Sequence, residues 1–518
     1  MRQKALIFIF LLVLFGIFDA GYLTYEHYAK SIPPCATSIF IDCGKVLRSQ
    51  YAVVYGIPLA LLGVIHYGVF FVNTLIALIT NKKLFKFFVV IQSSVGAFVS
   101  AYLMYLQFAV IQSICLYCTF SALISFAIFI LLMIYLRKEK KELVFLIFAF
   151  FYQNLLRKIF FLLDAEFIHE TMLSKGEILG KLTPIKFFIN RITSYPDKSL
   201  KQKIVGLNFD SPVGLAAGFD YEAKLPLITP ALGFGFQTIG TITNMPYEGN
   251  PKPRFGRLPK SKSLMVNKGF KNEGANQVIK KLGNFVIKDF EIPIGISIGR
   301  TNSPKLPSLK QSIQDIVEAF EKFERSKVKH KYYELNISCP NIIHEGEITF
   351  YPPKNLKQLL SAVEKLRIKK PIFIKMPIEK NDRETLNMLE VISKYKIAGA
   401  IIGNLQKNRK DPAFVQEEVK KWKIGNFSGK PTFNRSNELI RLAYKKFSKK
   451  LTIIGCGGIF SPEDAYTKIK LGASLLQLIT GMIFQGPQLS AQINLGLIDR
   501  LKTDGFKNIK DAAGVDIL

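Results

Sequence analysis

Apolar residues are concentrated in the first third of the chain, and the remainder alternates between apolar and polar segments. Four apolar stretches near the N-terminus approach the length of about 20 helical residues that crosses a bilayer. The third stretch contains no charged residue, whereas a soluble helix exposes a polar face to water. The pattern predicts an all-α bundle of four transmembrane helices, at Ala5–Tyr25, Gly56–Ile79, Phe87–Ile111 and Ile114–Leu136.

A further apolar run, LVFLIFAFFYQNLLRKIFFLLDAEF, follows Glu142. Arg157 and Lys158 interrupt it, so we expect it to span a bilayer poorly and to lie in the interface as a pair of amphipathic helices. A fifth span is the alternative that its length leaves open. We assign residues 1–140 to the transmembrane domain and residues 141–200 to membrane-docking helices and a linker.

From Pro212 onward, short apolar segments alternate with amphipathic segments of helical length. Eight of the short segments have the length and composition of strands: PVGLAA, FQTIGTI, IPIGISI, YYELNIS, PIFIKM, GAIIGN, LTIIGC and LLQLIT. The alternation predicts an α/β domain, a (β/α)8 TIM barrel over residues 201–518. In such a barrel, function resides at the C-terminal ends of the strands.

The chain of 518 residues carries a formal net charge of +31. This charge could bind nucleic acid, but no zinc finger, basic repeat or aromatic RNA-binding motif accompanies it, so we expect no nucleic-acid partner. A lipid bilayer with anionic headgroups is the partner we favour, and a lysine-rich compositional bias is the alternative. None of the five histidines has the spacing of a metal site, and we expect no metal.

Lysine and arginine flank the apolar stretches asymmetrically. The segments MRQK, NKKLFK and RKEKKE all face the cytoplasm if the N-terminus is inside. We therefore expect a multi-pass protein of the inner cell membrane with a cytoplasmic barrel. Its outer, oxidising face would carry Cys35, Cys43, Cys115 and Cys118. A cleaved signal peptide is a less favoured reading of the first stretch, because three further spans follow it.

Cys115 and Cys118 form a C-x-x-C motif at the start of a predicted helix, where the helix N-terminus favours a thiolate. Cys35 and Cys43 lie on a loop that faces the same side. Two pairs of cysteines on one face of a bundle could pass electrons by thiol–disulfide exchange. Two purely structural disulfides are the alternative.

The segments DCGKVLRSQYAVVYGIPLALLG and CLYC resemble the bacterial homologues of vitamin K epoxide reductase. The resemblance implies that Cys115 and Cys118 reduce a quinone, with Cys118 nearest to it. It also implies that Cys35 and Cys43 shuttle electrons from a thioredoxin-like protein. Many such homologues are fused to a thioredoxin domain, and this sequence contains none, so we expect a separate thioredoxin-like thiol protein as partner.

Polar residues collect at the predicted C-terminal ends of the barrel strands. Asn336 and Cys339 close the fourth strand, Lys375 the fifth and Asn404 the sixth. The glycines of GCGGI, after the seventh strand, provide backbone N–H groups that suit a phosphate. A buried lysine beside neutral amides needs a polar ligand, and a flavin is one that supplies it. A small buried filler is the alternative for Cys339, and we expect Cys456 to serve packing.

The motifs PVGLAAGFD, NKGFKNEG, NISCPN, IIGCGGIFSPEDA and QGPQL resemble class 2, quinone-dependent dihydroorotate dehydrogenase. The resemblance runs from about Tyr152 to the C-terminus. It implies oxidation of (S)-dihydroorotate to orotate in pyrimidine biosynthesis, with FMN as cofactor and a membrane quinone as electron acceptor. Cys339 would be the base that removes the C5 proton while hydride leaves C6 for flavin N5.

The resemblance also implies two sets of binding residues. Those expected to bind FMN are Ala217, Gly218, Thr241, Ser297, Asn336, Lys375, Gly403, Gly429, Gly457, Gly458, Ile479 and Thr480. Those expected to bind dihydroorotate or orotate are Tyr221, Asn267, Lys268, Gly269, Phe270, Asn336, Asn341, Asn404 and Leu405. The register of Asn267 is shifted by one residue from the family's usual motif.

Several positions depart from the class 2 pattern. Cys339 stands where serine is usual, and a thiol with a pKa of about 8.5 ionises far more readily than a hydroxyl. Tyr221 stands where a substrate-site lysine is usual, Gly403 and Leu405 replace threonines, and NIIHEGEITFY differs from the usual lid. These departures leave a second hypothesis open. It is an FMN barrel that acts on another dihydropyrimidine, with the transmembrane bundle serving only as an anchor.

Overall fold

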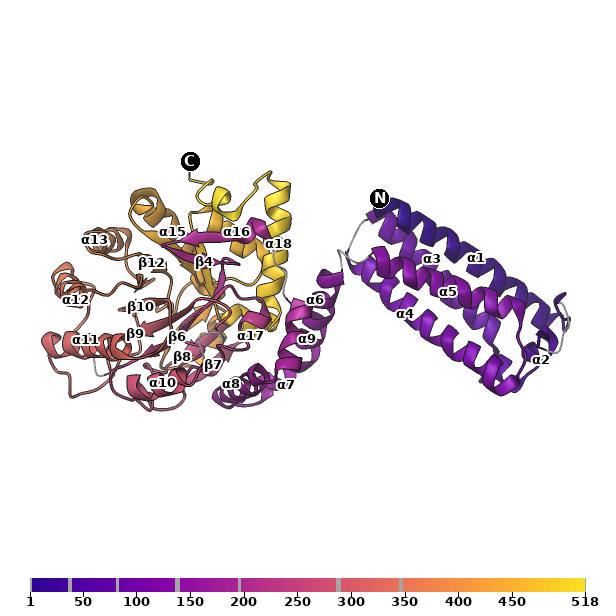
Figure 1. The fold of residues 1–518 in the computed structure, drawn as a ribbon, viewed down its shortest axis with the longest axis horizontal. Coiled ribbons are helices and arrows are strands. Elements are labelled where there is room, and N and C mark those ends of the chain that lie inside the picture. The colour runs from indigo at the N-terminus through magenta and orange to yellow at the C-terminus, as the bar shows by residue number, and fades with distance from the viewer. Residues whose placement is uncertain are drawn as a thin grey trace. The chain divides into compact units, whose positions relative to one another are not determined.

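The computed structural model describes residues 2–35, 40–80, 83–135, 140–193, 197–285, 290–343 and 348–517. The chain forms two compact units, Met1–Leu143 and Val144–Leu518 (Figure 1). Some residues used in the predictions lie outside the described ones. They are Asn81 and Lys82, the segment 136–139 at the end of the predicted fourth span, and residues 344–347 of NIIHEGEITFY.

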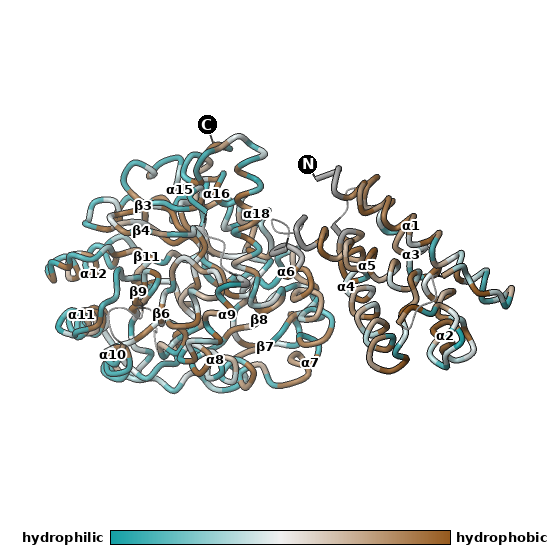
Figure 2. Tube along the Cα trace, turned by 45° about the vertical axis from the view of Figure 1, so that its right-hand side comes forward, coloured by the Kyte–Doolittle hydropathy of each residue, from teal (hydrophilic) through white to brown (hydrophobic). Residues whose placement is uncertain are grey.

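The first unit is built from four long helices, which confirms the predicted bundle. They are α1 (Arg2–Tyr28), α3 (Leu59–Thr80), α4 (Lys83–Tyr105), which continues as the π-helical turn η2 (Leu106–Ile111), and α5 (Leu116–Tyr135). Their buried faces share one apolar cluster, which includes Ile9, Phe70 and Ile128. Their outer faces are apolar as well: Phe18 is 73% and Phe98 is 78% exposed. Figure 2 shows hydrophobic residues along most of these helices, as association with a membrane requires.

The bundle also carries a short helix and a small hairpin. Helix α2 (Cys43–Leu47) begins at a loop cysteine, and β1 (Val53–Val54) pairs with β2 (Ile57–Pro58). The carboxylate of Asp42 accepts a hydrogen bond from the Lys45 N–H at 3.0 Å and caps α2. The loop that holds Cys43 is therefore anchored by ordinary capping chemistry.

Four helical stretches are long and apolar enough to cross a membrane: Leu6–Tyr28, Leu59–Thr80, Phe87–Ile111 and Val144–Leu162. Helix α5 contains a shorter apolar run, Leu116–Leu132. The stretch Val144–Leu162 runs without a break through α6 (Lys140–Phe151), η3 (Tyr152–Leu156) and α7 (Arg157–Leu162). Arg157 and Lys158 therefore do not end the helix, and the interfacial placement of this segment stays a prediction. The Arg157 guanidinium donates to the Phe484 carbonyl at 3.0 Å, which satisfies the charged group without ending the helix.

The second unit contains a closed barrel of eight parallel strands, as the sequence predicted. The strands are β5 (Val213–Leu215), β6 (Phe236–Ile242), β9 (Ile294–Ile298), β10 (Tyr332–Asn336), β11 (Ile372–Met376), β12 (Gly399–Ile402), β14 (Thr452–Cys456) and β15 (Leu475–Leu478). They hydrogen-bond in chain order, and β15 pairs with β5 to close the ring. Most are buried on both faces, because side chains fill the interior and helices cover the outside.

Helices surround the barrel, and polar residues predominate along the outer ones (Figure 2). They are α8 (Ala165–Lys181), α9 (Thr183–Thr193), α10 (Gly274–Gly283), α11 (Leu309–Arg325), α12 (Pro353–Lys365), α13 (Asp382–Ile392), α14 (Gln416–Lys420), α15 (Phe433–Phe447), α16 (Pro462–Lys470), α17 (Thr480–Gln485) and α18 (Leu489–Thr503). Two smaller sheets were not expected from the sequence pattern. One is the antiparallel sheet of β7 (Phe255–Leu258), β8 (Ser263–Val266) and β13 (Asn426–Gly429), and the other is the hairpin of β3 (Gln202–Ile204) and β4 (Leu207–Phe209).

Candidate functional site

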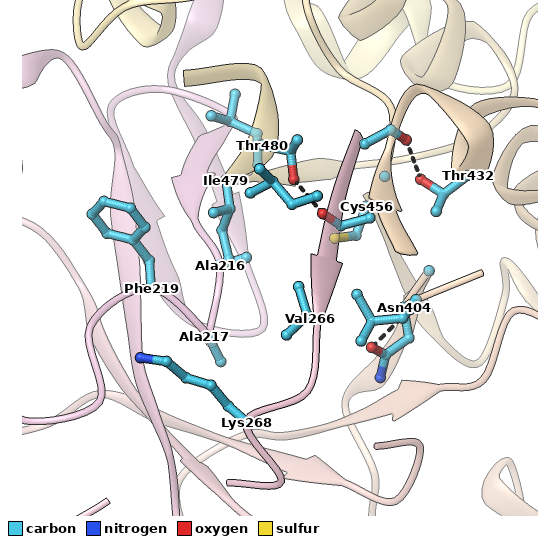
Figure 3. A pocket seen from close by; sticks show the side chains of 18 of the residues that line it. Ala216, Ala217, Phe219, Val266, Lys268, Asn404, Thr432, Cys456, Ile479 and Thr480 are labelled. Carbon is cyan, nitrogen blue, oxygen red and sulfur yellow. Dashed lines mark hydrogen bonds between the residues drawn. The ribbon is translucent and has the colours of Figure 1, made fainter. Parts of the chain in front are cut away.

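A pocket lies at the C-terminal ends of the barrel strands, and most of the predicted site residues line it (Figure 3). The predicted residues in its lining are Ala217, Gly218, Tyr221, Thr241, Lys268, Gly269, Phe270, Asn336, Cys339, Asn341, Lys375, Gly403, Asn404, Leu405, Gly429, Gly457, Gly458, Ile479 and Thr480. Parallel strands of a barrel all end on the same side, so residues distant in sequence meet there.

Cys339 follows β10 by three residues and lines the pocket, half-buried. The segment that leads to it is fixed by amide side chains. The Asn336 side-chain oxygen accepts hydrogen bonds from the Ser338 N–H and hydroxyl, each at 3.2 Å. The Asn404 amide donates to the Ser338 carbonyl at 3.1 Å. The thiol is thus carried on backbone held by side chains from the ends of β10 and β12.

Lys375 is buried on β11 and forms an ion pair with Glu334 at 3.4 Å. Gln477 donates to the other oxygen of the Glu334 carboxylate at 3.2 Å. Burial lowers the pKa of Lys375, but the charge of Glu334 outweighs this effect and the net pKa is raised. Lys375 therefore presents a fixed positive charge to the pocket.

Two predicted site residues lie behind the pocket wall rather than in it. The Ser297 hydroxyl is 2.9 Å from that of Thr241 and donates to Glu334 at 3.4 Å, because its strand position points the side chain into the barrel interior. The Asn267 oxygen accepts a hydrogen bond from the Asn250 amide at 3.0 Å. Val266 and Lys268, its neighbours on either side, line the pocket instead.

A glycine-rich wall is formed by the ends of β13, β14 and β15. The hydroxyls of Ser428 and Thr480 lie 2.8 Å apart, and the Thr432 hydroxyl donates to the Gly429 carbonyl at 2.8 Å (Figure 3). Gly457 and Gly458 follow β14 with φ values of 103° and 72°, which are left-handed conformations that favour glycine. The wall presents backbone groups and hydroxyls beside the aliphatic side chains of Ile459 and Ile479.

Some lining residues escaped the sequence analysis. Cys456, which we expected only to pack, contacts an apolar cluster and also lines the pocket. His169 from α8, Phe219 from the PVGLAAGFD segment and Phe255 from β7 line it too, although none of the three was expected at the site. Burial lowers the pKa of His169 well below its usual value, so this imidazole is neutral at physiological pH.

The four cysteines of the first unit lie in one cluster. Cys35 and Cys43 form a disulfide, which shares one apolar cluster with the thiols Cys115 and Cys118. The Cys118 N–H donates to the Cys115 sulfur at 3.4 Å, as the start of a helix allows. The structure thus brings the loop pair and the C-x-x-C pair together.

A cavity of about 830 Å³ lies within the bundle beside this cluster. Cys118 lines it, and so do Asp19, His66 and Tyr67 from α1 and α3. The Tyr67 hydroxyl lies 2.9 Å from that of Ser125. Over the described ranges of the chain, no group of three or more His, Cys, Asp or Glu residues could hold a metal ion.

Comparison with known proteins matches the two units to two different families. The model of the dihydroorotate dehydrogenase family matches residues 199–501, and that of the vitamin K epoxide reductase family matches residues 7–133. Proteins named dihydroorotate dehydrogenase (quinone) from Trichodesmium erythraeum and Nostoc punctiforme are 33% and 34% identical over 369 and 371 residues. Each match covers 68% of this chain and 94% of the relative. The crystal structure of DHODH in complex with ferulenol from Eimeria tenella matches with 27% identity and a TM-score of 0.58, covering 68% of this chain and 96% of that one.

Proposed function

This chain belongs to the dihydroorotate dehydrogenase family, and from that premise we propose that its barrel oxidises (S)-dihydroorotate to orotate with FMN and passes the electrons to a membrane quinone. The observation that carries the proposal is the convergence of Cys339, Asn336, Lys375 and a glycine-rich wall in one pocket. A base, amides for a pyrimidine ring, a cation for a flavin ring and a phosphate site are the parts that this reaction requires.

The residues present fit FMN. A Cβ added to Gly429 would lie 2.3 Å from the Lys262 carbonyl oxygen, and one added to Gly458 would lie 2.5 Å from Phe433 Cβ. Only glycine can therefore form these turns, whose exposed backbone suits a phosphate. Lys375 and Thr241 would hold the ring. When bound, FMN supplies a two-electron acceptor for the substrate and a donor for the quinone.

The protein's own chemistry in this reaction is proton removal and orientation. Cys339 would take the C5 proton of dihydroorotate as a thiolate, the form in which a cysteine acts as a base. Asn336, Asn341 and Asn404 would bind the ring and its carboxylate. Their side chains are already fixed by hydrogen bonds to the protein, so the substrate meets an ordered set of partners.

For the first unit we propose quinone-linked thiol–disulfide exchange. The packing of the Cys35–Cys43 disulfide on Cys115 and Cys118 supports this function. A dithiol partner would give two electrons and two protons to the Cys35–Cys43 bond, and the same two electrons and protons would pass through Cys115 and Cys118 to a quinone in the cavity. A separate thioredoxin-like protein would be the partner.

The proposed domains are residues 1–140 for the bundle, 141–200 for the membrane-docking segment and 201–518 for the barrel. The proposed topology places the barrel in the cytoplasm and the four bundle cysteines on the outer face of the inner membrane. Both units would then deliver electrons to one quinone pool without direct coupling. Modification of Cys339 by an impermeant maleimide applied from outside would contradict this topology.

The test uses the full-length protein, purified in detergent with its flavin. Dihydroorotate should bleach the flavin absorbance anaerobically, and a quinone should restore it. Cys339→Ala should lose the bleaching, whereas Cys118→Ala should keep it because its thiol lies in the other unit. Equal loss in both variants would refute the independence of the units. No bleaching of the wild type would favour the alternative, a barrel that oxidises another dihydropyrimidine beside a bundle that is only an anchor.

A further inference from the structure

Lys268 is a buried lysine whose charge has no direct counter-ion. It is 3% exposed and lines the barrel pocket. Its ammonium lies over two aromatic rings, 4.4 Å from the centroid of Tyr221 and 4.5 Å from that of Phe255. Within the described part of the chain, Lys268 forms no salt bridge, and its side chain extends toward the loop that bears Phe219 (Figure 3).

The carboxylates around Lys268 are engaged elsewhere. Glu166 pairs with Lys271 at 3.3 Å and with Arg254 at 3.4 Å. Glu170 pairs with Lys271 at 2.8 Å, and Glu222 with Lys224 at 2.7 Å. These groups contribute a distant field to Lys268 but no ion pair.

The remaining neighbours of Lys268 cannot neutralise it. Burial raises the pKa of Tyr221 and lowers the pKa of His169, so both side chains are neutral at physiological pH. Burial lowers the pKa of Lys268 itself to about 8, so the ammonium is still the main form at pH 7. Burying a charge that lacks a partner is costly, and the two cation–π contacts offset only part of that cost.

The two lysines in the pocket lining differ in one respect. Lys375 has Glu334 at 3.4 Å, whereas Lys268 has only ring faces. An anionic group on a ligand is what would complete the surroundings of Lys268. Asn341 and Cys339 also line the pocket and belong to the proposed substrate site. Among the lining residues that the structure describes, Lys268 is the one lysine without an ion pair.

We propose that Lys268 binds the carboxylate of the substrate and makes the barrel selective for an anionic dihydropyrimidine over a neutral one. The proposal rests on the proposed function and deepens it, since it names the residue that recognises the carboxylate of the substrate. It also gives Tyr221 a defined part, because its ring face holds the ammonium in the pocket until the carboxylate arrives. Lys268 is thus a residue for specificity, and Cys339 remains the base.

The test compares two ligands that differ by one carboxylate. Binding of orotate and of uracil is measured by calorimetry on the full-length flavoprotein, for the wild type, Lys268→Met and Lys268→Arg. Lys268→Met should weaken orotate binding about 10- to 100-fold, the effect of one charge-assisted hydrogen bond, and should leave uracil binding unchanged. Lys268→Arg should retain most of the orotate affinity because it keeps the charge.

A second variant guards against a folding defect in the first. The exchange Tyr221→Lys with Lys268→Tyr moves the ammonium to the facing position and should recover orotate affinity relative to Lys268→Met. Wild-type affinity for orotate should also fall above pH 8 as Lys268 deprotonates, and Lys268→Met should lack this dependence. The hydrogen bond to Lys271 lowers the pKa of Glu170, and the pKa of Lys271 is raised, so neither group accounts for a change of affinity near pH 8.

The outcomes separate the two proposals. If the wild type oxidises dihydroorotate but Lys268→Met binds orotate as tightly as the wild type, the role of Lys268 is refuted and the proposed function stands. If Lys268→Met loses orotate and uracil equally, Lys268 is structural and the proposal is also refuted. If the wild type neither binds orotate nor oxidises dihydroorotate, both proposals fail.

Discussion

The buried ion pair between Lys375 and Glu334 offers a quantitative test of how the barrel interior is stabilised. Glu334→Gln keeps the shape of the side chain and an oxygen that accepts the hydrogen bond from Gln477, but it removes the counter-charge of Lys375. Both side chains are almost wholly buried, at 6% and 0% exposure. Breaking such a pair costs about 3–5 kcal/mol, because the remaining charge is left without a partner in a medium of low dielectric constant.

The expected shift in melting temperature follows from the size of the unit. Unfolding entropy is about 2.1 cal/mol/K per residue, so the barrel unit, Val144–Leu518, has about 0.8 kcal/mol/K. A loss of about 3–5 kcal/mol then lowers the melting temperature by about 4–6 °C. Trp422 is the only tryptophan in the sequence and lies in this unit, so its fluorescence during heating reports on the barrel alone.

Three controls make the result specific to the buried pair. Glu390→Gln removes one side of an exposed pair with Lys394, both side chains being over 60% exposed, and should not shift the melting temperature measurably. Glu334→Gln with Lys375→Met should regain most of the loss, because no charge stays buried. The single variant should also gain stability as pH rises, since its Lys375 would bind its proton more weakly than an unfolded lysine does. A melting temperature of Glu334→Gln within 1 °C of the wild type would refute this reasoning.

Two further predictions concern the cofactor and the bundle. Gly458→Ala should lower the flavin content of the purified protein, measured by absorbance, because the added Cβ would lie 2.5 Å from the Cβ of Phe433. The control is Gly505→Ala, at a φ of 80° with no atom within 4 Å, which should retain flavin. Equal losses of flavin in the two variants would contradict a local effect. Cys43→Ser leaves Cys35, which is half-buried, and should form a lasting mixed disulfide with a peptide that carries one activated cysteine. Cys35→Ser leaves Cys43, which is 1% exposed, and should not form this adduct. Gel electrophoresis without reductant measures the adduct, and preferential reaction at Cys43 would refute the inference that Cys35 is the accessible sulfur of the pair.

The barrel could be predicted from the sequence because its strands are buried on both faces. FQTIGTI and PIFIKM are apolar runs bounded by turn residues, and they coincide with β6 and β11. Strands β7, β8 and β13 have four residues each and mixed burial, so no comparable run marks them. The helix continues through Arg157, whose charged group donates to the carbonyl of Phe484, a partner far away in the sequence that the local pattern could not indicate.

Site residues were predicted best where a strand end fixes their direction. Asn336 and Lys375 are paired in register on β10 and β11, so both side chains reach the pocket. Ser297 lies on β9, where its hydroxyl meets Thr241 and Glu334 inside the barrel. A shift of one residue reverses the face of a strand, and this is also why Asn267 lies outside the lining while both of its neighbours lie in it.

The contrast between the two pocket lysines explains why substrate selectivity required a structure. A sequence can place a lysine on a strand or in a loop, but the state of its charge depends on groups brought by other elements. Glu334 comes from the neighbouring strand and completes Lys375, whereas the carboxylates nearest Lys268 are already paired with other cations. Lys375 is therefore satisfied by the fold, and Lys268 is satisfied only when an anion enters. An unpaired cation held at 3% exposure is maintained at a cost in stability, and binding of a carboxylate is the event that offsets this cost.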